Sequence, residues 1–359
     1  MPFDRRAALA ALFATGLPGC TSLGPSRLDR DQLDYTRAVA DASKQQTLFN
    51  LVRLRFGDAP AFLSVNQLVS SYSLQRSGSA STNIFPSGAI NTFFGLGGNV
   101  QLTDTPTFTL QPVAGDQFVE SYLRPIAPDE VIPLIQGGIP ADLLLWLIAQ
   151  SIGTLQNTHP LARGHRGGSP GFRQTLADLR RLQEGGAMTV AMRGEKADRH
   201  AYLQFNTAER PELAQVQREL YARLGVAAAA QEVKVVYGTG TSPRAAPARR
   251  PEIPILTRAL IGVMSAVAAE IEVPEAAVRS GRTKPTLREP GDPPPLLRVH
   301  SGPTPPENPY AAVRFAESWY WIDDTDFRSK LVFTVFELLK SIAESPQARN
   351  ATVLTIPTR

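Results

Sequence analysis

Three carboxylates near the C-terminus form the closest group of side chains in this 359-residue chain that could do chemistry. Asp323, Asp324 and Asp326 follow an aromatic stretch at residues 319–322. Such a cluster could bind Ca²⁺ or supply a general acid and base. The segment lacks the glycine and the later glutamate of an EF-hand loop, and the sequence predicts a helix from about Phe327. We therefore expect these carboxylates to cap that helix, where acids satisfy free amides and favour the dipole.

A second candidate is the serine in residues 167–171 (GGSPG), which match the G-x-S-x-G pattern of serine hydrolases. The pattern needs a strand before the serine and a helix after it. Residues 163–166 (RGHR) are not typical of a strand, and Pro170 has no amide to donate to an oxyanion. The segment around Ser169 is therefore predicted to be a flexible loop.

The remaining candidate ligands for a metal or cofactor are scattered. The four histidines, at positions 159, 165, 200 and 300, show no H-x-x-x-H or H-E spacing. Cys20 is the single cysteine, which excludes an intramolecular disulfide and cysteine-based zinc sites. The G-x-G at residues 238–240 lacks the rest of a dinucleotide fingerprint. We expect no cofactor, no metal and no catalytic residue, and the dispersed charges, net +4, predict no nucleic-acid partner.

Aromatic side chains mark two candidate binding regions. Trp319, Trp321 and Phe315 would share one face of a strand over residues 312–322, with Tyr320 on the other face. That arrangement suits either a core strand or a platform for carbohydrate stacking. A polar stretch at residues 77–99 carries three more exposed candidates. The candidate binding residues are Phe85, Phe93, Phe94, Trp319 and Trp321.

The N-terminus has the three parts of an export signal. Arg5 and Arg6 precede an apolar stretch at residues 7–16 that is too short to span a bilayer as a helix. Residues 17–20 (LPGC) follow, and they resemble the lipobox of bacterial lipoproteins. The resemblance implies that signal peptide 1–19 is removed and that Cys20 carries acyl chains such as palmitate, which anchor the protein to a membrane.

The same resemblance implies a place in the cell envelope. The residue after the cysteine is Thr21 and not aspartate, which in this family implies transfer to the outer membrane, on its periplasmic face or the cell surface. In the body of the chain, residues 51–58 (LVRLRFGD) and 321–324 (WIDD) are similar to an uncharacterised family of proteobacterial envelope lipoproteins. That second resemblance implies no activity.

The elements that must position these residues predict an α+β fold. After a lipidated tether at residues 20–30, residues 31–160 are predicted to hold an N-terminal helix, a long β-hairpin and a helical cluster. Periodicity and proline positions place these elements. They are a helix at 31–56, strands at 61–76 and 100–113 joined by a polar tip at 77–99, and helices at 115–124, 128–136 and 140–153.

Residues 171–359 are predicted to form a mixed α/β region. A proline-rich loop at 279–309 and a linker at 241–254 interrupt it. The predicted helices cover 172–184, 209–224, 255–271 and 326–344, and the predicted strands cover 187–193, 200–206, 232–237, 312–322 and 351–356.

Three functions are consistent with these observations. The first is a lipid-anchored outer-membrane lipoprotein that acts by binding or assembly, with an envelope protein or further copies of itself as partner. The second is a surface-tethered hydrolase of envelope glycan or ester that uses Asp323, Asp324 or Ser169. The third is a subunit of an oligomeric outer-membrane channel that contributes the 61–113 hairpin, because a lone hairpin leaves unpaired edges that lipid does not tolerate.

Overall fold

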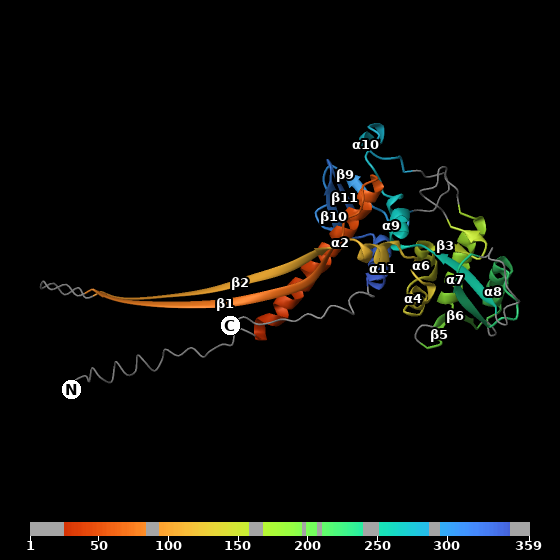
Figure 1. Ribbon diagram of the computed structural model, residues 1–359, viewed down its shortest axis with the longest axis horizontal. Helices are drawn as coiled ribbons and strands as arrows, with labels where there is room; N and C mark the ends of the chain where they lie inside the picture. Colours follow the sequence, from red (N-terminus) through yellow and green to blue (C-terminus); the bar gives the residue numbers. More distant parts are fainter. Residues whose placement is uncertain are drawn as a thin grey trace.

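The protein consists of a body from which one helix and a long two-stranded ribbon project (Figure 1). The fold is α+β, as predicted. This computed structural model describes residues 25–83, 93–157, 168–195, 199–206, 210–239, 251–286 and 295–344.

A six-stranded sheet forms one half of the body, in the order β4-β3-β8-β7-β6-β5. Its neighbouring strands are antiparallel except for β7 and β8, which are parallel. The strands are β3 (Ala149–Ile152), β4 (Leu155–Gln156), β5 (Met188–Arg193), β6 (His200–Phe205), β7 (Glu232–Tyr237) and β8 (Glu252–Thr257).

One face of this sheet is packed against helices, because apolar residues alternate along its central strands. The alternating residues Val233, Val235, Ile253 and Ile255 are almost completely buried. Apolar side chains from the sheet and from five helices share one hydrophobic core. These helices are α4 (Pro128–Val131), α5 (Pro133–Gln136), α6 (Ala141–Ile148), α7 (Pro170–Glu184) and α8 (Pro211–Leu224).

The other half of the body is built around a three-stranded sheet in the order β10-β11-β9. It packs with two long helices, and its buried residues continue the same hydrophobic core. The elements are β9 (His300–Gly302), β10 (Pro309–Phe315), β11 (Ser318–Asp323), α2 (Pro25–Arg55), α3 (Asp116–Phe118), the π-helix η1 (Val119–Leu123), α9 (Leu260–Ala268), α10 (Glu275–Arg279) and α11 (Phe327–Glu344).

A buried cation joins the two halves. Arg258 is 4% exposed, and its guanidinium donates to the carbonyl oxygens of Trp146 and Leu147 at 3.1 and 3.0 Å. Those carbonyls lie at the C-terminal end of α6, where the helix dipole favours positive charge. Burial lowers the pKa of Arg258 to about 10. The side chain thus holds the end of α6 against the segment between β8 and α9.

The ribbon consists of β1 (Leu63–Asn83) and β2 (Phe93–Pro112), and its root is fixed in the body. Asn50 of α2 is completely buried, and its amide donates to and accepts from the backbone of Ala61 at 2.8 Å in each direction. Phe62 stacks on Tyr122, with ring centroids 4.0 Å apart. These contacts fix where and in which direction the ribbon leaves the core.

Only the C-terminal part of α2 is embedded in the body. Its first buried residue is Thr47, and every described side chain from Gln32 to Gln46 is exposed or half-buried. Glu337 of α11 accepts hydrogen bonds from Ser43 and Thr47 at the start of the embedded part. At about 1.5 Å per residue, the preceding helical residues extend roughly 27 Å from that point. They follow the same side of the body as the ribbon (Figure 1).

Several predicted boundaries were wrong, and for the strands the reason is that tertiary pairing overrode local patterns. The helix α2 begins at Pro25, inside the predicted tether. The ribbon strands extend into the polar stretch predicted as a tip, to residue 83 in β1 and from residue 93 in β2, since cross-strand pairing outweighs the low strand propensity of serine and glycine. The predicted helix at 140–153 includes strand β3, and the predicted helix at 255–271 includes part of strand β8. The predicted strand at 312–322 is instead part of the hairpin β10–β11.

Other predicted elements agree with the structure. The helices predicted at 172–184, 209–224 and 326–344 and the strands predicted at 187–193, 200–206 and 232–237 are present with small boundary shifts. The strand predicted at 351–356 lies outside the described residues. Among the helices that the structure describes, none is long and apolar enough to cross a membrane.

Candidate functional site

The ribbon β1–β2 is a candidate interaction site because its backbone is only half paired. The ladder runs from Leu63 opposite Pro112 to Asn83 opposite Phe93. Each strand uses one edge for this ladder and leaves the other edge open. In the described parts of the chain, no third strand joins either open edge. Nor does any described element outside the ribbon pack extensively along β1 or β2.

The two faces of the ribbon differ in composition. A bulge between Val65 and Gln67 shifts the register by one residue, so that Leu63 and Val65 occupy the same face as Leu68. Beyond the bulge, even-numbered positions share one face and odd-numbered positions share the other. The even face carries Leu68, Tyr72, Leu74, Ala80, Phe94, Leu96, Val100, Leu102 and Phe108, together with Arg76 and Asp104.

The odd face is almost entirely polar and uncharged. Ser, Thr, Gln and Asn occupy most of its positions in both strands, with glycines near the distal end. The register pairs Ser71 with Thr105, Ser73 with Thr103 and Gln75 with Gln101. The register thus gives the ribbon one mainly apolar face and one polar face.

The predicted phenylalanine site divides between these faces. Phe93 and Phe94 lie at the distal end of β2, where register places Phe94 opposite Thr82 on the even face and Phe93 opposite Asn83 on the odd face. Phe85 lies outside the described residues, as does the predicted lipidation site, Cys20. The distal end of β2, where Phe93 and Phe94 lie, is far from β11 in the body (Figure 1). The structure therefore does not bring the four described residues of the predicted binding set together.

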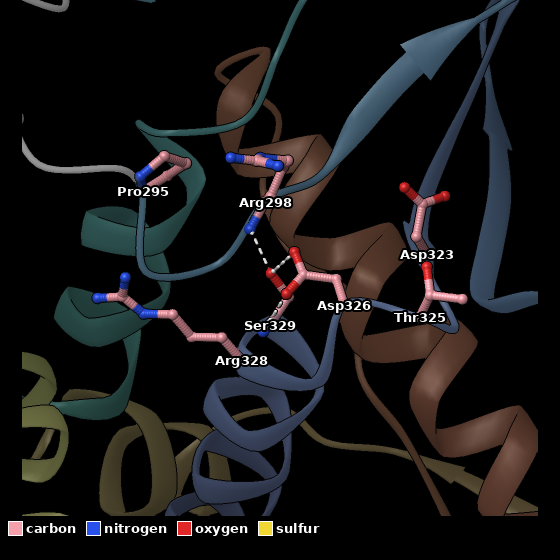
Figure 2. A pocket seen from close by; sticks show the side chains of 7 residues that line it. All are labelled: Pro295, Arg298, Asp323, Thr325, Asp326, Arg328 and Ser329. Atoms are coloured by element: carbon pink, nitrogen blue, oxygen red, sulfur yellow. Dashed lines mark hydrogen bonds between the residues drawn. The ribbon is translucent and has the colours of Figure 1, made fainter.

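A cleft of about 380 Å³ lies in the body beside the start of α11 (Figure 2). Figure 2 shows the side chains of Arg298 and Arg328 toward one side of the cleft and Asp323 toward the other. Asp326 and Ser329 lie between them and form hydrogen bonds with each other. The cleft thus combines both signs of charge around a helix terminus that is already capped.

Asp326 is the residue that caps α11. Its carboxylate accepts hydrogen bonds from the Ser329 amide at 3.0 Å and from the Ser329 hydroxyl at 2.7 Å. Burial alone would raise the pKa of Asp326, but the Ser329 hydrogen bonds and the positive charges of Arg298 and His300 outweigh it and lower the pKa. The Ser329 hydroxyl also accepts a hydrogen bond from the backbone amide of Arg298 at 2.9 Å. Helix capping, the expected role of this acidic cluster, is confirmed for Asp326.

The other two acids of the cluster bind different partners. Asp324 forms an exposed ion pair with Lys330 at 2.8 Å. Asp323 accepts a hydrogen bond from the indole of Trp321 at 3.0 Å and lies 3.2 Å from Nε2 of His300. The other ring nitrogen of His300 lies 3.2 Å from Glu272. These contacts link β11 and β9 to the segment between α9 and α10.

The tryptophans occupy the outer face of β11. Tyr320 and Ile322 are buried in the core, whereas Trp319 and Trp321 are half-buried on the opposite face. The ring of Trp321 lies against Gly302, where a Cβ atom would approach a ring carbon to 3.1 Å. Trp321 is thus held flat against β9 by packing and by its bond to Asp323.

The prediction that Phe315 shares a face with the tryptophans was wrong. Residues 316 and 317 form a turn, so Phe315 pairs with Ser318 and lies on the Tyr320 side. Its ring packs 5.0 Å from that of Phe56 in the core. Counting alternate residues through the turn gave the wrong face, because the chain reverses there.

The remaining candidates take structural roles where they are described. Ser169 precedes α7, has ordinary backbone angles, and its hydroxyl accepts a hydrogen bond from the amide of Gln156 at 3.0 Å. His200 lies 3.4 Å from Asp129. His159 and His165 lie outside the described residues. Within the described ranges, no group of three or more His, Cys, Asp and Glu residues is arranged to hold a metal ion.

Comparisons with known proteins identify no relative of this chain. No protein-family model, curated protein or solved structure matches the chain. The features that indicate a function are therefore the ribbon and the sequence of the N-terminal segment.

One feature of the site had no signal in the sequence pattern. The contacts of His300 join residues far apart in the sequence, and no motif spacing relates Glu272, His300 and Asp323. The continuous ribbon did have a signal, which is the alternation of apolar and polar residues that persists across the glycine- and serine-rich stretch. The bulge at residues 65–67 hides this alternation by changing its parity.

Replacing Asp326 with alanine should lower the free energy of unfolding by about 1 kcal/mol at neutral pH, because α11 loses its cap. Urea unfolding monitored by circular dichroism measures this change. The matched variant Asp324→Ala, which removes an exposed ion pair, should change it by less than about 0.5 kcal/mol.

The contribution of Asp326 should also depend on pH. The folded state lowers its pKa below the ordinary value of 3.8, so the carboxylate stabilises the fold when ionised and this stabilisation is lost as pH falls below 3.8. The unaltered protein and Asp326→Ala should therefore converge in stability in acid. Equal differences at pH 3 and pH 7, or equal effects of both alanine variants, would contradict the capping role.

Proposed function

We propose that this protein is a lipid-anchored protein of the cell envelope that acts by assembly, and that copies of the chain join through the open edges of the ribbon β1–β2. The observation that carries the proposal is the antiparallel ladder of about twenty pairs with both outer edges unpaired. The catalytic alternative has less support, since Asp323 accepts a hydrogen bond from Trp321, Asp324 forms an ion pair with Lys330, and the Ser169 hydroxyl accepts a hydrogen bond from the Gln156 amide.

An isolated ribbon of this length needs a partner. Two strands alone are marginally stable in water, and three or more strands or a packed face are required for stability. Here the ladder extends far beyond its root at Phe62 without cover from other described elements. A long open edge is a template for strand addition. Another strand on each edge would pair the backbone and bury part of the apolar face.

A second copy of the same chain is the partner that fits both edges at once. The open edge of β1 in one copy can take the open edge of β2 in the next, and the antiparallel alternation then continues without change. Such head-to-tail contact is heterologous, and it closes into a ring when the rotation between copies permits. One kind of contact thus satisfies every copy.

The N-terminal segment supports attachment to a membrane. Cys20 lies five residues before Pro25, where α2 begins, and the tetrapeptide LPGC at residues 17–20 fits a lipidation site. Several acyl chains on one residue suffice for stable anchoring. The projecting part of α2 would then act as a spacer that carries the body away from the lipid surface, on the side from which the ribbon emerges (Figure 1).

Shortening the ribbon should abolish assembly and leave the body folded. In this variant, residues 71–105 are replaced by Asn-Gly, which is a favoured two-residue hairpin turn. Light scattering of the detergent-solubilised full chain should give a closed multimer, and the shortened chain should give a monomer with the same urea midpoint for its body. A multimer of unchanged size without residues 71–105 would place the interface in the body and refute the proposal.

Replacing Cys20 with serine should abolish the incorporation of labelled palmitate and leave the signal segment attached, because the thiol is the acylated group. Gel mobility and radiolabelling of cells that express the chain measure both effects. Ser22→Ala, two residues away, should label normally. Unchanged labelling of Cys20→Ser, or no labelling of the unaltered chain, would contradict the anchor.

A further inference from the structure

We propose that the distal part of the ribbon, residues 74–82 of β1 and 94–102 of β2, crosses the lipid bilayer in the assembled protein, with the even face against lipid and the odd face around water. This inference rests on the assembly proposed above and adds what the assembly does, which is to open a water-filled passage for small polar solutes.

The two faces of this segment differ sharply in composition. Its even positions are mostly apolar and its odd positions carry only polar or glycine residues. The even positions are Leu74, Arg76, Gly78, Ala80, Thr82, Phe94, Leu96, Gly98, Val100 and Leu102, and the odd positions are Gln75, Ser77, Ser79, Ser81, Gly95, Gly97, Asn99 and Gln101. Alternation of apolar and polar residues, with apolar residues toward lipid, is the pattern of strands that line an aqueous channel.

The length of the segment matches the thickness of a membrane. A strand that crosses the hydrocarbon core at the usual tilt needs about 9–11 residues. Nine register pairs connect residues 74–82 with residues 94–102. The ribbon also extends past the first residue of α2 (Figure 1), so it reaches beyond the level from which the lipid anchor would start. The register pairs closer to the body then lie outside the hydrocarbon.

Lipid makes the open edges intolerable. Every unpaired N–H or C=O group in the hydrocarbon core costs several kcal/mol, so spanning strands must form a closed set. Two strands cannot close, and the head-to-tail contact between copies supplies the missing pairs. Because all odd faces then lie on the same side of the wall, the serine, glutamine and asparagine positions would enclose the water.

Two charged positions on the even face would come close together across the contact between copies. Within one copy, Arg76 is opposite Val100 and Asp104 is opposite Tyr72, four residues apart along the ladder. A strand tilt of about 35–45° requires neighbouring hairpins to be staggered by about two residues. In the sense set by right-handed coiling, Arg76 then lies opposite Leu102 of the neighbouring copy and diagonal to that copy's Asp104. Diagonal positions are about 7–8 Å apart, within reach of long side chains.

Cysteine substitution tests which face meets water. The variants Leu74→Cys and Ala80→Cys probe the even face, and their neighbours Ser73→Cys and Ser79→Cys probe the odd face. The full chain, with Cys20 acylated, is reconstituted in phosphatidylcholine vesicles and treated with a charged, water-soluble thiol reagent. The odd-face variants should react at least about tenfold faster than the even-face variants, since hydrocarbon excludes the charged reagent. Detergent denaturation should equalise the rates.

The outcomes separate this inference from the proposed function. Equal reactivity of both faces in a multimer of confirmed mass would overturn the membrane crossing and leave assembly standing. Absence of a multimer would overturn assembly itself. Unaltered multimers should also release a small polar dye from the same vesicles, and the chain shortened at residues 71–105 should not.

Charge exchange tests the contact between copies. Arg76→Asp and Asp104→Arg should each lower the temperature at which the multimer dissociates, because each places like charges at neighbouring positions. The double variant should restore most of the loss, because it re-forms the opposite pair. Additive loss in the double variant would overturn the predicted stagger.

Discussion

The open backbone edges of β1 and β2 are the strongest physical constraint in this structure. Each strand pairs along one side only, for about twenty residues beyond the body. Backbone N–H and C=O groups must find partners, in water or in another chain. Among the described residues, no other strand supplies backbone hydrogen-bond partners to the outer edges of the ribbon. The assembly proposed above would supply the missing partners from other copies of the chain.

The body serves to hold this ribbon in one direction. Asn50 closes the connection between α2 and β1 by pairing with both backbone groups of Ala61, and Phe62 stacks on Tyr122 in the core. Tyr122 in turn donates to Glu344 at 2.7 Å, and burial raises its pKa. Because these groups are completely buried or paired, movement at the root would break several contacts at once. In the proposed assembly, a rigid root would fix the angle at which copies of the ribbon meet.

The polar clusters of the body also have structural roles. Asp326 caps α11, Arg258 caps the end of α6, and His300 bridges two carboxylates between strands and a loop. Each cluster satisfies backbone or charged groups at the end of an element, where a buried unpaired group is costly. The acidic residues that were candidates for catalysis in the sequence thus stabilise the body from which the ribbon projects.

The sequence alone determined the local features, because these depend on residues close together in the chain. Proline positions, helical periodicity and the alternation of residues 61–76 and 100–113 predicted the α+β class, the hairpin and most helices, and the acids before Phe327 predicted the cap. Only the tertiary structure decided the register. The bulge at residues 65–67 and the turn before Ser318 each change which residues share a face, and neither follows from counting residues. The alternation of side chains along a strand is a local property, but pairing with the partner strand decides which set of alternate residues lies on which face.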